Sequence, residues 1–103
     1  MMYGLPPHTI QLILTEISNY PEICDLVIYG SRAKGTHKKG SDIDLAAKGE
    51  NITFGLITKL KTRFNQVMTI PYHIDLIHYE SIANKDLLDH IDRVGKSLFQ
   101  NNS

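Results

Sequence analysis

The sequence lacks the features that mark membrane-spanning, secreted or strongly basic proteins. Its single cysteine, Cys24, excludes an intramolecular disulfide and fits a reducing compartment. No apolar run approaches the ~20 residues of a membrane span, and residues 1–7 lack the basic and apolar regions of a secretory signal. Lys and Arg balance Asp and Glu at 11 each, so no overall field favours a nucleic acid or a membrane as partner. We therefore expect a cytoplasmic protein that binds neither nucleic acid nor membrane directly.

The length and the apolar pattern predict one small domain. At 103 residues the chain is long enough for a single modest core and too short for a second, so residues 1–103 are expected to form one domain. The first predicted element is a helix that starts at Pro6 and Pro7 and ends before residues 19–21. It is followed by a strand at 25–29, a short helix at 31–34, a strand at 42–48, a helix at 52–68 and a strand at 72–79. Asn84 caps a last helix, which buries residues up to Leu98. The order α-β-α-β-α-β-α predicts the class α/β (α+β), with a small mixed three-stranded sheet, helices on one face and the other face partly open.

The most informative feature is the segment 30–45, which reads GSRAKGTHKKGSDIDL. Gly30 and Ser31 form a small-residue corner directly after an apolar, β-branched run. A basic loop with four Lys and Arg residues and no acidic residue follows, and two carboxylates then stand one residue apart at Asp42 and Asp44. A basic loop alone is usually a solvated surface, but beside paired aspartates it favours phosphate binding.

Three aspartates form the candidate catalytic and metal-binding set. Because successive strand side chains alternate between faces, Asp42 and Asp44 are expected on the same face, ~7 Å apart along the strand. Two such carboxylates are not comfortably ionised without a cation, and Mg²⁺ prefers a few carboxylates together with substrate phosphates. Asp75, in the next predicted strand, reaches the same place if that strand lies beside the second. The three could then hold two ions ~3.5–4 Å apart, the spacing that serves phosphoryl transfer.

Residues around the basic loop are candidates for binding a nucleotide. A glycine at the end of a strand lets the backbone approach a ligand, and the N–H groups that open the short helix can point at an anion. Ser31 adds a hydroxyl donor, Arg32 offers charge for a leaving pyrophosphate, and Ser41 precedes the first aspartate. We therefore predict that Gly30, Ser31, Arg32 and Ser41 bind the nucleotide. His73 could line the same pocket, although a surface or packing role is the better interpretation of it.

The spacing of these residues resembles a known family signature. Gly30-Ser31, ten intervening residues and Asp42-Ile43-Asp44 are similar to the motif of the DNA polymerase β-like nucleotidyltransferase superfamily. Over roughly residues 9–100 the chain resembles its smallest branch, the minimal nucleotidyltransferases (MNT domains). The resemblance implies a polymerase β-like core, ATP or another nucleoside triphosphate as substrate, Mg²⁺ as cofactor, and Asp42 and Asp44 as metal ligands. It implies Asp75 as a third carboxylate that also helps to deprotonate the acceptor hydroxyl.

The resemblance also implies a partner, because no substrate or nucleic-acid domain follows the third predicted strand. Minimal nucleotidyltransferases of bacteria and archaea are typically paired with a helical HEPN-type RNase toxin, and the antitoxin transfers AMP from ATP to a tyrosine of that toxin. A hetero-oligomer is therefore expected. Two alternatives stay open: a non-catalytic antitoxin whose pocket senses nucleotide, and the catalytic subunit of a small-molecule, aminoglycoside-type nucleotidyltransferase.

Overall fold

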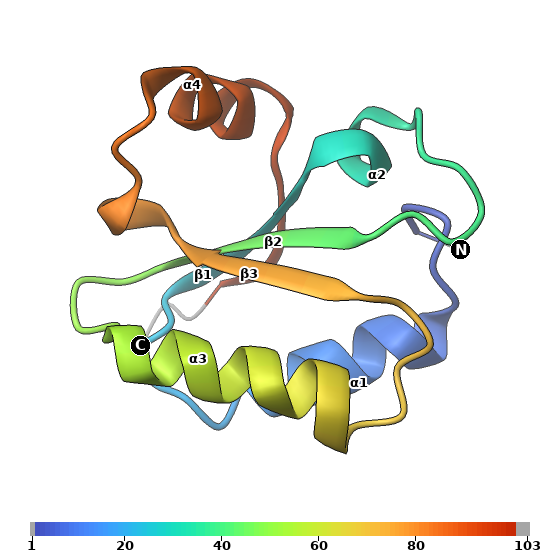
Figure 1. Ribbon diagram of the computed structural model, residues 1–103, viewed down its shortest axis with the longest axis horizontal. Helices are drawn as coiled ribbons and strands as arrows, with labels where there is room; N and C mark the ends of the chain where they lie inside the picture. Colours follow the sequence, from blue (N-terminus) through green and yellow to red (C-terminus); the bar gives the residue numbers. More distant parts are fainter. Residues whose placement is uncertain (1, 101–103) are drawn as a thin grey trace.

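The computed structural model describes residues 2–100, and in this part of the chain a four-stranded sheet lies between two layers of helices (Figure 1). In chain order the elements are α1 (Pro7–Ile17), β1 (Asp25–Tyr29), α2 (Gly30–Lys34), β2 (Ile43–Lys48), α3 (Phe54–Thr62), the π-helical turn η1 (Arg63–Val67), β3 (Ile74–His78), the 3-10 turn η2 (Tyr79–Ser81), α4 (Lys85–Val94) and β4 (Lys96–Gln100). The strand order is β3-β2-β1-β4. The predicted α/β (α+β) class with a mixed sheet is confirmed, with one strand more than predicted. Among the described residues, no helix is both long and apolar enough to cross a membrane.

The middle of the sheet sets the positions of the aspartates. β1 and β2 run antiparallel, and β3 joins β2 in parallel. Both middle strands are largely buried because apolar side chains dominate them. In this register Asp44 pairs with Tyr29 on one side and with Asp75 on the other. The C-terminal end of β1 therefore lies next to the N-terminal ends of β2 and β3, at one end of the strands.

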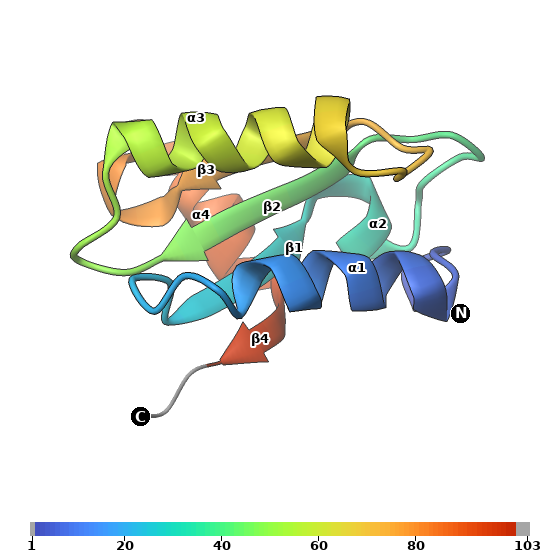
Figure 2. The same cartoon turned by 90° about the horizontal axis from the view of Figure 1, so that it is seen from below.

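One face of the sheet carries the main core. α1, α3 and η1 lie side by side on this face (Figure 2). Ile13 and Ile17 of α1, Leu60 of α3 and Phe64 of η1 are fully buried there, packed with the apolar side chains of the sheet. α3 starts after Thr53, whose side chain accepts a hydrogen bond from the Leu56 N–H at 3.1 Å. The helical periodicity seen in the sequence is thus the periodicity of one buried stripe.

The other face of the sheet is covered as well, whereas the sequence predicted helices on one face only. α2 and α4 lie on this second face (Figure 1). A smaller apolar cluster forms there from Val27, Tyr29, Ala46 and Ile91. Because the middle strands carry apolar side chains on both faces, a second helical layer is needed to remove them from water. The face that bears the aspartates is therefore partly roofed by α4.

The end of the chain differs from the prediction that the last helix continues to Leu98. α4 ends at Val94, and β4 begins after Gly95, whose main chain leaves no room for a side chain beside Val27. β4 pairs antiparallel with β1, which satisfies main-chain groups along an edge of a buried strand. Leu98 and Phe99 pack against the main core. A long-range strand pairing thus overrides a locally helical pattern and supplies the fourth strand.

A buried carboxylate joins α1 to η1. Glu16 is 6% exposed and accepts hydrogen bonds from Nε and Nη2 of Arg63 and from the hydroxyl of Tyr20. The hydrogen bond from Arg63 lowers the pKa of Glu16, although burial acts in the opposite direction. Because η1 leads into β3, this link also helps to fix the strand that carries Asp75.

Glu16→Gln is expected to lower the Tm by several degrees at neutral pH and to make the Tm fall less as the pH is lowered. Because the pKa of Glu16 is lower in the folded than in the unfolded chain, its ionised form stabilises the fold above the ordinary pKa of 4.5. That stabilisation is lost as the pH falls through the lowered value. Thermal unfolding followed by circular dichroism from roughly pH 7 to pH 3 measures the effect. Equal pH slopes for the two proteins would contradict the assignment to Glu16.

Candidate active site

Asp44 and Asp75 lie directly opposite each other on the adjacent strands β2 and β3. Their strand neighbours Ile43 and Ile74 are fully buried in the main core. Because strand side chains alternate, both aspartates project from the opposite face, toward the layer of α2 and α4. Asp42 stands directly before β2, and its charge acts on Asp44, so the two carboxylates lie near each other. The structure therefore brings together the three aspartates that the sequence pattern selects.

The Gly30 corner adjoins the carboxylate of Asp44. β1 ends at Tyr29, and the chain turns into α2 with Gly30 at φ +75°. A Cβ atom added to Gly30 would overlap Oδ2 of Asp44. The turn thus requires glycine at residue 30 for two reasons: the backbone is left-handed, and there is no space for a side chain. Ser31 follows in α2, so the predicted phosphate-binding pair begins where the chain meets Asp44.

Arg32 is bound by the protein itself. It is 2% exposed, and its guanidinium donates to the main-chain oxygen of Ser41 from Nε (3.1 Å) and Nη2 (2.7 Å) and to that of Tyr3 from Nη1 (2.9 Å). The guanidinium also stacks on Tyr72, 5.0 Å from the ring centroid. Arg32 therefore ties the basic loop and the N-terminal turn to α2, close to the start of β2. This is a positioning role, and a direct contact of Arg32 with a nucleotide stays a prediction.

Ser41 shapes the end of the basic loop. Its hydroxyl accepts a hydrogen bond from the Lys38 N–H at 2.9 Å, and its own N–H donates to the Lys38 oxygen at 3.0 Å. Together with the bonds from Arg32, these contacts close a turn immediately before Asp42. The turn thus presents Asp42 at the sheet edge, while the predicted nucleotide contact of Ser41 stays a prediction.

Burial and the neighbouring negative charges raise the pKa of Asp44. Burial is the largest cause, followed by the charges of Asp75 and then Asp42, while His90 and Arg32 act in the opposite direction. Ionised Asp44 is therefore less stable here than a carboxylate in water. A divalent cation or another positive group would relieve that cost.

With the geometry established, the comparisons decide the family. Residues 11–103 match the family model described as polymerase beta, nucleotidyltransferase. The chain belongs to this nucleotidyltransferase family. The family that the sequence resemblance implies is thus confirmed, while the roles of the aspartates and of Gly30 stay predictions. No curated protein matches the chain significantly.

Solved structures with a similar fold include three toxin–antitoxin complexes. One, with AMP-PNP, aligns with a TM-score of 0.64 at 24% identity over 95% of this chain and 76% of the other. The MntA–HepT complex aligns with a TM-score of 0.70 at 18% identity over 93% and 74%. The complex of the tri-AMPylated Shewanella oneidensis HEPN toxin with MNT antitoxin aligns with a TM-score of 0.62 at 20% identity over 89% and 73%. At these identities the likeness establishes the fold of the nucleotidyltransferase.

Two of the aspartates of the nucleotidyltransferase each have a basic neighbour. Nζ of Lys61 lies 3.8 Å from Oδ1 of Asp75, and Nδ1 of His73 lies 3.5 Å from Oδ2 of Asp42. All four side chains are substantially exposed, so solvent screening keeps these contacts weak. Both carboxylates can therefore turn to another ligand at little cost.

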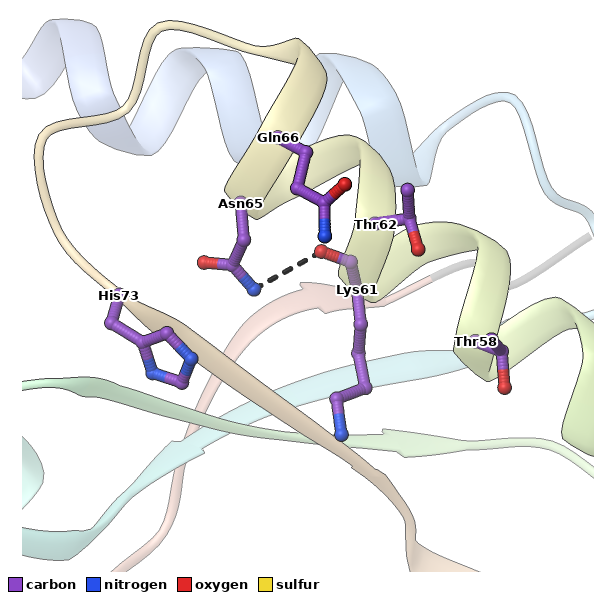
Figure 3. A pocket seen from close by; sticks show the side chains of 6 residues that line it. All are labelled: Thr58, Lys61, Thr62, Asn65, Gln66 and His73. Carbon is purple, nitrogen blue, oxygen red and sulfur yellow. Dashed lines mark hydrogen bonds between the residues drawn. The ribbon is translucent and has the colours of Figure 1, made fainter.

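Lys61 and His73 also line a hollow of about 310 Å³ (Figure 3), which their contacts with Asp75 and Asp42 place next to these two aspartates. The other lining residues come from α3 and η1: Thr58, Thr62, Asn65 and Gln66. The Asn65 side chain donates to the Lys61 oxygen at 3.0 Å and bonds both main-chain groups of Ile74 at 2.8 Å, which secures the start of β3. Sequence reasoning missed Lys61, because helical spacing places it outside the buried stripe of Ile57, Leu60 and Phe64.

The aspartates suit a metal ion that arrives with its substrate. Within residues 2–100, no group of three or more His, Cys, Asp or Glu side chains is placed to hold a metal ion by itself. Mg²⁺, however, usually takes only one or two carboxylates and completes its coordination with water and substrate phosphates. Asp44 and Asp75, paired across two strands, supply hard oxygen donors on one face, and Asp42 lies near Asp44. The donor set fits Mg²⁺ bound together with a nucleotide.

His90 is the site residue that sequence reasoning missed most clearly. The main-chain N–H of Gly30 donates to Nε2 of His90 at 3.2 Å, across 60 residues of chain. The imidazole also meets the Tyr29 ring edge-on, with centroids 6.0 Å apart and planes at 81°. Helical spacing from Leu87 places His90 on the inner side of α4, but that pattern does not tell which strand the helix covers.

Proposed function

We propose that this nucleotidyltransferase transfers AMP from ATP to a tyrosine hydroxyl of a HEPN-type RNase toxin and so acts as its antitoxin. The observation that carries the proposal is the paired Asp44 and Asp75 beside the Gly30 corner. Family membership supports the reaction type. The similar structures support the partner and the nucleotide, since they are toxin–antitoxin complexes, one with AMP-PNP and one with a tri-AMPylated HEPN toxin.

The proposed reaction is a single displacement at phosphorus. The tyrosine oxygen attacks the α-phosphorus of ATP, the bond to the oxygen that bridges the α- and β-phosphates breaks, and pyrophosphate leaves. Asp75 accepts the hydroxyl proton, while Gly30 and Ser31 hold the phosphates in line with the acceptor. Such catalysis depends on positioning and charge stabilisation, with little covalent work by the protein.

Asp42, Asp44 and Asp75 would hold Mg²⁺, with two ions as the fullest arrangement. When bound, Mg²⁺ neutralises charge on the phosphates and orients them. The raised pKa of Asp44 supports this assignment, because burial and the neighbouring charges of Asp75 and Asp42 both disfavour its ionised form, and a cation would offset both. The two weak pairs, of Asp75 with Lys61 and of Asp42 with His73, would be given up in that state.

The partner supplies the acceptor, so we propose a hetero-oligomer. The hollow beside Lys61 and His73 is open to solvent and lined by polar residues, which suits an approaching tyrosine hydroxyl better than a buried apolar ligand. We propose no direct role for a nucleic acid, since the chain has no net charge.

The test uses the purified complex with a helical protein encoded next to this one. With Mg²⁺ and ATP labelled at the α-phosphorus, label is expected on a tyrosine of the partner, and ATP labelled at the γ-phosphorus should give none. The variant with alanine at residues 42, 44 and 75 should transfer nothing. Mass spectrometry of the partner locates the modified residue and counts the nucleotides added.

Two other outcomes would replace the proposal. If the triple-alanine variant still silences the partner in cells, the protein neutralises by binding alone. If the partner stays unlabelled while an aminoglycoside-type small molecule becomes labelled, the acceptor is not a protein. Transfer that is unchanged in the triple variant would place the chemistry elsewhere.

A further inference from the structure

The main-chain N–H that faces the proposed phosphate site is already engaged. Gly30 N donates to Nε2 of His90 at 3.2 Å, and the turn that presents this N–H lies against the Asp44 carboxylate. The inference rests on the proposed function, in which Gly30 holds a phosphate of ATP. An N–H group has a single hydrogen, so it cannot serve the imidazole and a phosphate oxygen at full strength together.

The hydrogen bond gives Nε2 of His90 the role of acceptor at this contact. A nitrogen that accepts a hydrogen bond carries a lone pair and no proton. Nε2 of His90 therefore stands where a phosphate oxygen would accept the same hydrogen. His90 reaches this place because α4 packs against α2 and β1, with Ile91 buried in the smaller apolar cluster.

We propose that His90 covers the phosphate-binding corner in the nucleotide-free protein and that ATP displaces it. The contact protects a main-chain donor that would otherwise face a half-open site. Release is inexpensive, because Ile91 is the buried residue of α4 and the rest of this helix is at most half-buried. His90 thus acts as a positioning residue that lowers the affinity for nucleotide and leaves before the reaction.

Two substitutions of His90 separate this role from a structural one. His90→Phe keeps a ring beside Tyr29 but removes the acceptor, whereas His90→Gln keeps an acceptor for the Gly30 N–H. We expect Phe to lower the Kd for ATP with Mg²⁺ by about two- to tenfold, the usual net worth of one hydrogen bond. The Kd of the Gln variant should stay within about twofold of the wild type. His8→Phe, at an exposed position on α1, is the matched control and should change nothing.

The titrations are made by calorimetry on this protein without acceptor, so they need no transfer. In steady state with the acceptor, the Phe variant should lower KM and leave kcat unchanged, because His90 is absent from the reacting complex. A higher Kd in the Phe variant would overturn the proposal and make His90 a nucleotide ligand. An unchanged Kd would overturn it too, since His90 would then not compete with the nucleotide.

Nuclear magnetic resonance tests the displacement on the wild-type protein, so this test does not depend on how a variant folds. The Gly30 amide signal should shift when ATP and Mg²⁺ are added, and the contact between the rings of His90 and Tyr29 should weaken. A ring contact that persists in the ATP complex would overturn the displacement. If no variant binds ATP at all, the proposed function fails with it, whereas ATP binding that is insensitive to His90→Phe removes this inference alone.

Discussion

Asp44→Asn is expected to reduce nucleotidyl transfer by roughly a thousandfold, the several kcal/mol that a bound metal ion supplies in the transition state. Asparagine keeps the size of the side chain but removes its charge, so the fold around β2 should be preserved. The loss should appear mainly in kcat, measured with labelled ATP and the partner. Excess Mg²⁺ should restore only part of it.

The same substitution should stabilise the nucleotide-free protein. Because the pKa of Asp44 is raised in the fold, its stabilising contribution is present below the ordinary pKa and is lost as the pH rises through the raised value. Ionised Asp44 is therefore a cost at neutral pH, which asparagine does not incur. In a chelating buffer near pH 7, the Tm of Asp44→Asn is expected to exceed that of the wild type. Addition of Mg²⁺ and ATP should raise the Tm of the wild type more.

A matched control separates the site from general charge effects. Asp89 forms an exposed i,i+4 pair with Arg93 on α4, and such pairs contribute little. Asp89→Asn should leave both transfer and Tm nearly unchanged. Activity retained in Asp44→Asn, or a Tm that falls in the chelating buffer, would contradict the metal role and the charge repulsion respectively.

The parts of the site that could be predicted from the sequence follow local rules. Strand alternation predicts that Asp42 and Asp44 lie together, and a glycine at the end of a strand permits the turn at Gly30. The pairing of Asp44 with Asp75 required one further assumption, that β3 lies next to β2, and the structure has that arrangement. The prediction succeeds here because period-two patterns and turn residues act within a few residues of chain.

The parts that could not be predicted depend on contacts between distant segments. His90 meets Gly30 only because α4 returns across the second face of the sheet. Lys61 looks like a solvated residue of α3 until β3 is placed beside it. Arg32 stands in a basic loop that suggests phosphate binding, but the N-terminal turn supplies a carbonyl oxygen that draws its guanidinium inward. Each case is a tertiary contact that no local pattern encodes.

The strand pairing of β4 makes the same point for the fold. Residues after Gly95 have apolar spacing compatible with a helix. They form a strand instead, because they pair with the main-chain groups along the free edge of β1. The competition is between local propensity, worth tenths of a kcal/mol per residue, and a row of main-chain hydrogen bonds. The row of hydrogen bonds prevails.

Gly30→Ala is expected to destabilise the fold and to disable the site together. The backbone of residue 30 has φ +75°, and the added methyl group would overlap Oδ2 of Asp44. The left-handed backbone costs about 1–2 kcal/mol for a residue with a side chain, and the forced contact adds about 1–3 kcal/mol. A carboxylate moved by about 1 Å should lower transfer by about a hundredfold. Chemical denaturation gives the stability, and labelled ATP with the partner gives the activity.

Gly35→Ala is the control that isolates the contact with Asp44. Gly35 has nearly the same backbone angle, φ +78°, but a Cβ atom there meets nothing within 4 Å. Gly35→Ala should therefore lower the free energy of unfolding only by the cost of the left-handed backbone, and it should leave nucleotidyl transfer nearly unchanged. In a background of Asp44→Ala, which removes the overlapping oxygen, Gly30→Ala should cost no more than Gly35→Ala. If Gly30→Ala remains the costlier change in that background, the overlap with Asp44 is not its cause, and the turn itself must be what excludes a side chain.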